Sequence, residues 1–121
     1  MAYINDEVFD QGLDYADTNG TRLDITSAEA ATYAEATTTY TLGNDTVNTG
    51  TTEAGAVDGR RVIVPAITAG SVTGTGTATH WALTDGSSVL IATGALTSSQ
   101  AVTSGNTFTL DAISITVRDA A

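Results

Sequence analysis

The stretch Gly70–Gly94, which reads GSVTGTGTATHWALTDGSSVLIATG, decides the fold class of this chain. Small and β-branched residues alternate over residues 71–83, the pair Asp85-Gly86 follows, and a second apolar run begins at Val89. Two such runs joined by an Asp-Gly turn are typical of a β-hairpin. The stretch therefore predicts an all-β protein with short turns.

Further strand signals lie on both sides of this hairpin. Residues 22–26 alternate polar and apolar side chains, and residues 38–42 form a Thr-rich extended run. Residues 60–67 form an apolar run whose Pro65 suits a sheet edge or a bulge better than a central ladder. Residues 43–59 hold four glycines and hardly a large apolar side chain, which predicts a loop that contacts a partner.

The last apolar run changes phase partway along. Phe108 and Leu110 alternate in one phase, whereas Ile113 and Ile115 alternate in the opposite phase. A single extra residue in one strand causes such a shift, so the pattern predicts a β-bulge near residues 111–113.

One helix is expected, from Asn5 to about Ala16. Asn5 can cap it, and acidic residues suit the positive end of the helix dipole. Its apolar side chains gather on one side, which should pack on the β-domain or on a neighbouring subunit: Ile4, Val8, Phe9, Leu13 and Ala16.

We expect two parts in the chain. Residues 1–20 form an N-terminal arm with the short helix, and residues 21–121 form the β-domain. Five to seven short strands favour a two-sheet β-sandwich of the jelly-roll or Greek-key kind, with a small barrel as the alternative.

Composition limits the kinds of partner. The chain has 121 residues, no Lys, four Arg and 14 acids, for a net charge of −10, and only 15% of its residues are charged. A direct nucleic-acid partner is not expected, because phosphates require a basic face. The acids lie mostly before residue 59 and form either a solvated surface or a docking face for a basic partner.

The lack of cysteine and the N-terminal sequence further limit the kinds of site and the location that we expect. The absence of Cys excludes disulfides and thiolate metal sites. The first residues, MAYINDEVFDQG, have neither a basic flank nor a long apolar run, so we expect no signal peptide, no membrane anchor and synthesis in a cytoplasm.

No catalytic constellation is expected. His80, the sole histidine, would need Ser98 or Ser99 and an acid such as Asp85 to form a triad, and it fits a packing or interface role better. One His without Cys cannot supply the usual zinc ligands.

Two further patterns are weak signals of a functional site. The acids of the helix could bind calcium or act as an acid/base pair, but a solvated helix face explains them. Gly74 and Gly76 lie in a strand pattern without the helix and Lys of a phosphate loop. We therefore expect no enzymatic activity and no cofactor.

Five segments of the chain resemble small virion proteins of tailed bacteriophages, and the likeness spans most of the chain after Asp17. They read TRLDI at 21–25, ATTTYTLG at 36–43, GRRV at 59–62, ATHWALTDG at 78–86 and ATG at 92–94. These proteins look like capsid cement or decoration proteins, which sit over capsomer junctions and reinforce the shell.

The resemblance implies a function by association. The partner would be the major capsid protein, together with self-association for which a trimer is favoured. The location would be the capsid surface of the virion, after synthesis in the host bacterial cytoplasm. Nucleic acid and membrane are not expected as partners.

Six residues are candidates for the interface. Arg60 and Arg61 could pair with capsid acids, or be ordinary surface charges. His80 and Trp81 could anchor a subunit contact, with sheet core as the alternative for Trp81. Phe9 and Leu13 are the large apolar residues of the helix that could reach a neighbour.

Two other functions compete with this one. A tail, neck or fibre component would use a similar β-domain at a different copy number. A carbohydrate-binding module or glycan hydrolase would need an exposed aromatic platform or paired acids in a cleft.

Overall fold

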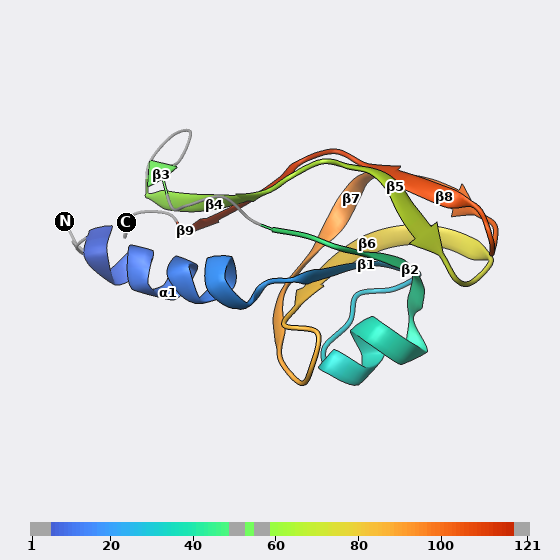
Figure 1. Cartoon of the computed structure of the whole chain (residues 1–121), viewed down its shortest axis with the longest axis horizontal. Helices are drawn as coiled ribbons and strands as arrows, with labels where there is room; N and C mark the ends of the chain where they lie inside the picture. Colours follow the sequence, from blue (N-terminus) through green and yellow to red (C-terminus); the bar gives the residue numbers. More distant parts are fainter. Residues whose placement is uncertain (1–5, 49–52, 55–58, 118–121) are drawn as a thin grey trace.

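The computed structural model describes residues 6–48, 53–54 and 59–117. Figure 1 shows the helix and strands in sequence order. Their bounds are α1 Asp6–Asn19, β1 Arg22–Thr26, the π-helix η1 Glu35–Thr39, β2 Thr41–Thr46, β3 Glu53–Ala54, β4 Arg60–Val64, β5 Ile67–Val72, β6 Gly76–Thr84, β7 Leu90–Val102, β8 Thr107–Leu110 and β9 Ile113–Val117.

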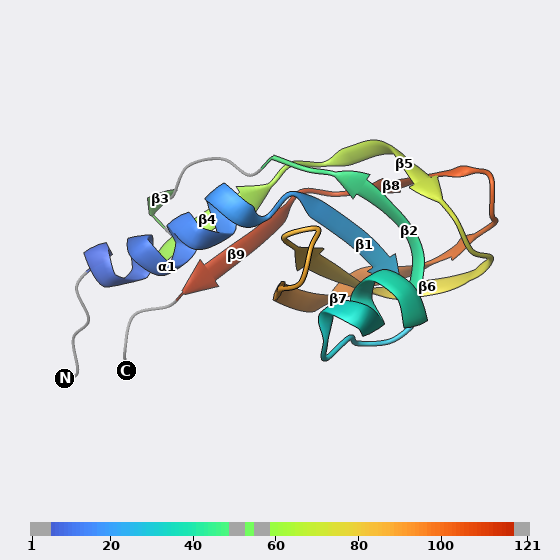
Figure 2. The same cartoon turned by 60° about the horizontal axis from the view of Figure 1, so that its bottom comes forward.

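The strands form one large and one small antiparallel sheet. The large sheet has six strands in the order β7-β6-β1-β2-β5-β8, and the small sheet has the order β3-β4-β9. The large sheet curls, so that its concave face encloses the main core (Figures 1 and 2). The predicted β-rich class with one N-terminal α-helix is confirmed, whereas the pairing does not confirm a two-sheet sandwich.

The hairpin predicted from the opening stretch is β6 and β7. Its turn carries Gly86 at φ 77°, a conformation that favours glycine. The carboxylate Oδ1 of Asp85 accepts the backbone N–H groups of Ser87 and Ser88 at 2.8 Å and of Val89 at 3.0 Å. The first strand begins later than the alternation predicts, because Ser71 belongs to β5, which pairs with β2 and β8.

Strand β1 lies at the middle of the large sheet and sets its register. Leu23 pairs with Leu83, and Ile25 pairs with Trp81, on the concave face. Leu23, Ile25 and Leu83 are fully buried. Because successive side chains of a strand alternate, Asp24 points to the opposite, convex face.

The convex face carries an ion pair whose carboxylate is buried. Arg22 contacts both carboxylate oxygens of Asp24, through Nε at 2.8 Å and Nη2 at 3.0 Å, and the hydroxyl of Thr41 donates to Asp24 Oδ2 at 2.7 Å. The Asp24 side chain is 0% exposed, whereas that of Arg22 is 31% exposed. The hydrogen bond to Asp24 raises the pKa of Arg22 above its ordinary value.

The phase change near the end of the chain is a change of sheet. Strand β8 belongs to the large sheet and β9 to the small one, and residues 111–112 join them. Their partners β5 and β4 change sheet at the same place, across Pro65 and Ala66. The predicted single-residue bulge at 111–113 is therefore wrong, since both strands of the ribbon reverse their buried face together.

Helix α1 packs on the small sheet. Leu13 and Ala16 are 3% and 4% exposed and form a cluster with Val62 of β4, against which Ile91 and Ile115 also pack. The helix lies beside β4 and β9, at the end of the molecule away from the curled sheet (Figure 2). The division into an arm and a β-domain stays a prediction, although the helix shares its apolar contacts with β4, β7 and β9.

Two element boundaries predicted from the sequence differ from those in the structure. The strand predicted at 38–42 is confirmed only at its end, because Thr38 and Thr39 belong to the π-helix η1 and β2 begins at Thr41. The predicted loop at 43–59 starts too early, because Gly43 pairs with Val72 inside the sheet, where an added Cβ would approach the main chain of β5. Residues 49–52 and 55–58 of that loop lie outside the described residues.

The contribution of the Asp85 carboxylate to the stability of the hairpin turn should depend on pH. Hydrogen bonds from the N–H groups of Val89, Ser88 and Ser87 lower the pKa of Asp85. A lowered folded-state pKa stabilises the fold above the unfolded pKa, and this contribution is lost as pH falls through the folded value. We expect Asp85→Asn to lower the midpoint of thermal unfolding near neutral pH, with a difference from the original protein that shrinks toward about pH 2.

Circular-dichroism melts across this pH range measure the effect. Asp14→Asn, on an exposed position of α1, is the matched control and should change the midpoint much less. A midpoint difference for Asp85→Asn that stays constant with pH would contradict the role of the carboxylate.

Removing one partner of the Arg22–Asp24 pair should destabilise the fold more than removing both charges. We expect Arg22→Met to lower the free energy of unfolding by about 2–4 kcal/mol, because it leaves the Asp24 carboxylate buried without its cation. The double variant Arg22→Met with Asp24→Asn should recover part of that loss. Urea unfolding of the three proteins gives the values, and a loss below about 0.5 kcal/mol for Arg22→Met would show that the pair is unimportant.

Candidate functional site

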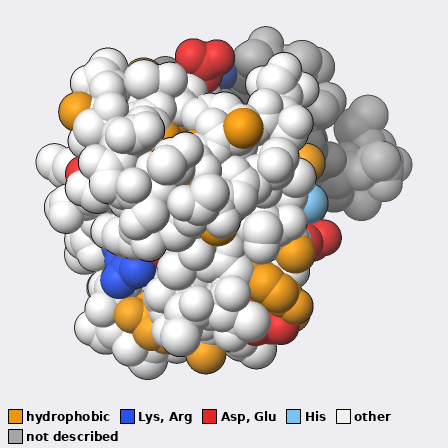
Figure 3. Space-filling model, turned by 90° about the vertical axis from the view of Figure 1, so that its right-hand side faces the viewer, with side chains coloured by type: hydrophobic (Ala, Val, Ile, Leu, Met, Phe, Trp, Pro, Cys, Tyr) orange, Lys and Arg blue, Asp and Glu red, His pale blue; other side chains and the backbone are white. Residues whose placement is uncertain are grey.

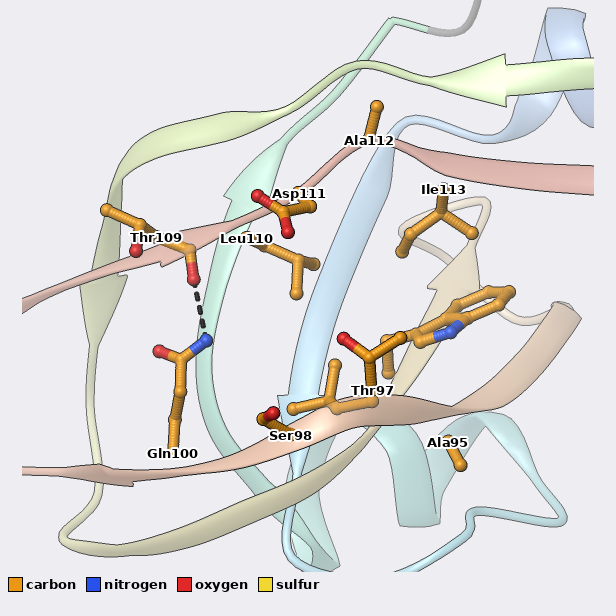
Figure 4. A pocket seen from close by; sticks show the side chains of 11 residues that line it. Ala95, Thr97, Ser98, Gln100, Thr109, Leu110, Asp111, Ala112 and Ile113 are labelled. Carbon is orange, nitrogen blue, oxygen red and sulfur yellow. Dashed lines mark hydrogen bonds between the residues drawn. The ribbon is translucent and has the colours of Figure 1, made fainter.

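A pocket opens between the two ends of the curled sheet. It has a volume of about 570 Å³ and lies between β7 on one side and the connection from β8 to β9 on the other. Figure 4 shows Thr97, Ser98 and Gln100 on the β7 wall opposite Leu110, Asp111 and Ile113. Pockets of this size commonly bind small molecules or peptide segments.

The β7 wall departs from regular pairing at the pocket. Ala78 pairs with Gln100 and His80 pairs with Ala95, so four residues of β7, numbers 96–99, oppose the single residue Thr79. Such a bulge moves part of the strand out of the ladder. The face that β6 turns toward the core also changes at this place. Ala78 and Trp81 are an odd number of residues apart, yet both side chains belong to the main core.

The opposite wall is the point where the chain crosses from β8 to β9. Val64 pairs with Ile113 in the small sheet and Ile67 pairs with Leu110 in the large sheet. Pro65, between them, has no N–H to donate to residues 111–112. Both walls of the pocket are therefore places where strand pairing stops.

The floor of the pocket is apolar and includes the indole of Trp81. Trp81 is 9% exposed, and Leu96, Leu110 and Ile113 are partly buried against the same core. Gly94, its cross-strand partner, lies against the ring, because an added Cβ would meet Nε1 at 2.7 Å. The indole therefore lines the pocket but is too covered to serve as a stacking platform.

The rim of the pocket is polar. Gln100 Nε2 donates to the carbonyl oxygen of Thr109 at 2.8 Å and links the two walls at one end (Figure 4). Asp111 is the ionisable residue of the lining. The lining therefore combines an apolar floor with hydroxyl, amide and carboxylate groups at the edge.

The face of the molecule at the end away from α1 carries few charges. Figure 3 shows a face made largely of polar uncharged side chains and backbone, with scattered apolar and charged groups. Strand β7 contributes to this character, because its 13 residues, LIATGALTSSQAV, include no charged residue and no proline.

The six predicted interface residues lie in different places. Arg60 and Arg61 are half-buried in β4 and both interact with other groups, and His80 is half-buried in β6 with Nδ1 2.9 Å from Thr79 Oγ1. Trp81 lies in the core at the pocket floor, and Leu13 is buried against Val62 of its own chain. The Phe9 side chain lies outside what the structure describes. Of the five whose side chains are described, only Trp81 lines the pocket.

The residues of a catalytic triad are not joined in the described part of the chain. His80 bonds to its neighbour Thr79, and Asp85 Oδ1 accepts backbone N–H groups of its own turn. Ser98 lines the pocket, but no hydrogen bond connects it to His80 among the residues that the structure describes.

Two further features are absent from the described residues. No three or more His, Cys, Asp or Glu side chains gather there in a way that could hold a metal ion. None of the helices described is long and apolar enough to cross a membrane.

Comparisons of the chain with models of protein families, with curated proteins and with solved structures found no match in any of the three.

Sequence reasoning missed most of the pocket residues, among them Leu96, Gln100, Thr109 and Asp111. The sequence does hold a partial signal of the β7 wall, because an uncharged run of 13 residues is long for a strand at a sheet edge. The bulge in β7 could not be read from the sequence, since the run itself shows no break.

The packing of Gly94 against Trp81 gives a testable prediction. We expect Gly94→Ala to lower the free energy of unfolding by about 1–3 kcal/mol and to shift the fluorescence of Trp81, the sole tryptophan, because the ring must move. Gly12→Ala is the control, since its added Cβ meets nothing within 4 Å, and it should stabilise the helix by up to about 1 kcal/mol. Equal unfolding free energies for the two variants would refute the close contact.

Proposed function

We propose that this chain is a virion structural protein of a tailed bacteriophage, a capsid cement or decoration protein. In this role it binds the outer surface of the major capsid protein lattice and stabilises the head. The proposal starts from the resemblance of five segments, which include ATHWALTDG at 78–86, to small virion proteins. It assigns the chain no enzymatic activity and no cofactor.

The observation that carries the proposal is the long uncharged edge of β7. Natural sheets protect an exposed edge with charges, prolines, bulges or short strands, because unpaired backbone groups invite pairing with another chain. Strand β7 is at the end of its sheet, and its 13 residues include neither a charge nor a proline, although residues 96–99 bulge from the ladder. An edge of this kind supports a function in which the protein associates with other chains.

The surface composition supports the same conclusion. A domain with 15% charged residues has few side chains that keep copies apart, and hydroxyl groups can pair at a polar interface. Self-association, with a trimer favoured, and repeated contacts over a lattice would add avidity. The jelly-roll or Greek-key sandwich predicted from the sequence stays a prediction, and the proposed role requires only a β-rich body.

Two other functions remain as alternatives. A tail, neck or fibre component would use the same edge but would be present in a ring or along a fibre. A carbohydrate-binding module is less favoured, because Trp81 is only 9% exposed and cannot offer the face of its ring to a sugar.

Cryo-electron microscopy of virions that carry this protein tests the proposal. We expect its density to repeat across the icosahedral shell, in contact with the outer face of the major capsid protein. Density confined to the tail, neck or portal vertex would replace the cement role with the tail alternative. Absence from the particle would reject both virion roles.

A further inference from the structure

The two end strands of the large sheet face each other without forming a ladder. Strands β7 and β8 end the order β7-β6-β1-β2-β5-β8, and the curl of the sheet brings them to opposite walls of one pocket. Within the described residues, the hydrogen bond that joins these walls at the pocket comes from the Gln100 side chain to Thr109 O. The sheet is thus an incomplete barrel with a gap between its ends.

Both walls present backbone groups that lie outside regular ladders. Residues 96–99 of β7 oppose a single residue of β6, and residues 111–112 lie opposite Pro65 and Ala66, where the ribbon changes sheet. Thr97, Ser98, Asp111 and Ala112 are exposed, so water can reach these walls.

A ligand that displaces this water must replace its hydrogen bonds, because a buried unpaired N–H or C=O group is costly. An extended peptide supplies a donor and an acceptor at every residue, which a small apolar molecule does not. The walls therefore favour a peptide backbone as the ligand.

The lining also selects side chains. The apolar floor is formed by Leu96, Leu110, Ile113 and Trp81, and Asp111 is the ionisable group at the rim. In an added strand, alternate side chains point to opposite faces, so apolar side chains can enter the floor while the others stay outside. The carboxylate of Asp111 favours a Lys or Arg on the incoming segment.

The charge of the chain argues for a different protein as the source of that segment. The chain has no Lys and four Arg against 14 acids, so a second copy offers few cationic segments that could pair with Asp111. We propose that the pocket between β7 and the β8–β9 connection binds an extended, cationic segment of a partner protein, which adds to the sheet as a strand. This inference does not require the virion role, because it concerns how the site recognises a peptide.

Selection of peptides from a display library of random linear heptapeptides on the full-length protein tests the proposal. We expect enrichment of sequences with apolar or β-branched residues at alternate positions and at least one Lys or Arg. Enriched peptides without tryptophan, made synthetically, should change the fluorescence of Trp81, the single tryptophan of the chain, as they bind. Failure to enrich any peptide above background would overturn the proposal.

Matched variants place the binding in the pocket. Ser98→Arg adds a cation to an exposed position of the pocket wall, whereas Ser87→Arg makes the same change at an exposed position of the hairpin turn. We expect Ser98→Arg to weaken binding of the synthetic peptides at least about tenfold and Ser87→Arg to leave it unchanged, while both keep the original circular-dichroism spectrum. Equal binding to both variants would place the peptides elsewhere and overturn the assignment.

Two further measurements test the mode of binding and the source of the segment. Methylation of alternate backbone N–H groups of an enriched peptide should abolish binding, and unchanged binding would exclude strand addition. Asp111→Asn should reduce the preference for peptides with Lys or Arg, and an unchanged preference would overturn the charge argument. Self-association in sedimentation velocity that Ser98→Arg abolishes would identify a second copy as the occupant and overturn the choice of a different protein.

Discussion

The simultaneous change of buried face in the ribbon of β4–β5 and β8–β9 is the constraint on which the rest of the structure depends. Val62 and Val64 are buried in the small sheet, whereas Ile67 is buried in the large one, so the inward phase reverses across Pro65 and Ala66. A register shift between Ile67 and Gly70 then changes the phase within β5, so that Val72 is buried as well. The partner strands reverse at residues 111–112, and the register is the same at the pairs Val64–Ile113 and Ile67–Leu110 that flank the crossing. One antiparallel ribbon thus contributes to two sheets, and each part buries a different set of side chains.

This crossing links the helix, the core and the pocket. On one side of it, the small sheet gives α1 an apolar surface at Val62, which a short helix needs because it is marginal by itself. On the other side, β5 and β8 continue the curled sheet around Leu23 and Leu83. Since β8 leaves the large sheet at residue 111, it does not complete a ladder with β7, and the pocket fills the space that remains.

The central strand β1 fixes the curl from both of its faces. Its concave side holds Leu23 and Ile25 against the hairpin, and its convex side holds Asp24 in a bidentate contact with Arg22. A one-residue slip would exchange these faces and bury the aliphatic side chains where the ion pair lies, so the register is strongly specified. This rigid centre holds the two end strands in place, and the sheet remains open only where β7 bulges and β8 turns away.

The sequence by itself determined the β-rich class, the N-terminal helix and the β6–β7 hairpin with its Asp85-Gly86 turn, because these features depend on local periodicity and turn chemistry. It also signalled a break near residue 111, where Leu110 and Ile113 differ in phase. Only the tertiary structure decided that this break is a change of sheet, that residues 96–99 bulge from β7, and that Gln100 and Asp111 meet at one pocket. These features depend on pairing between distant strands. The residue pattern of one strand does not specify which strand it pairs with or in which register.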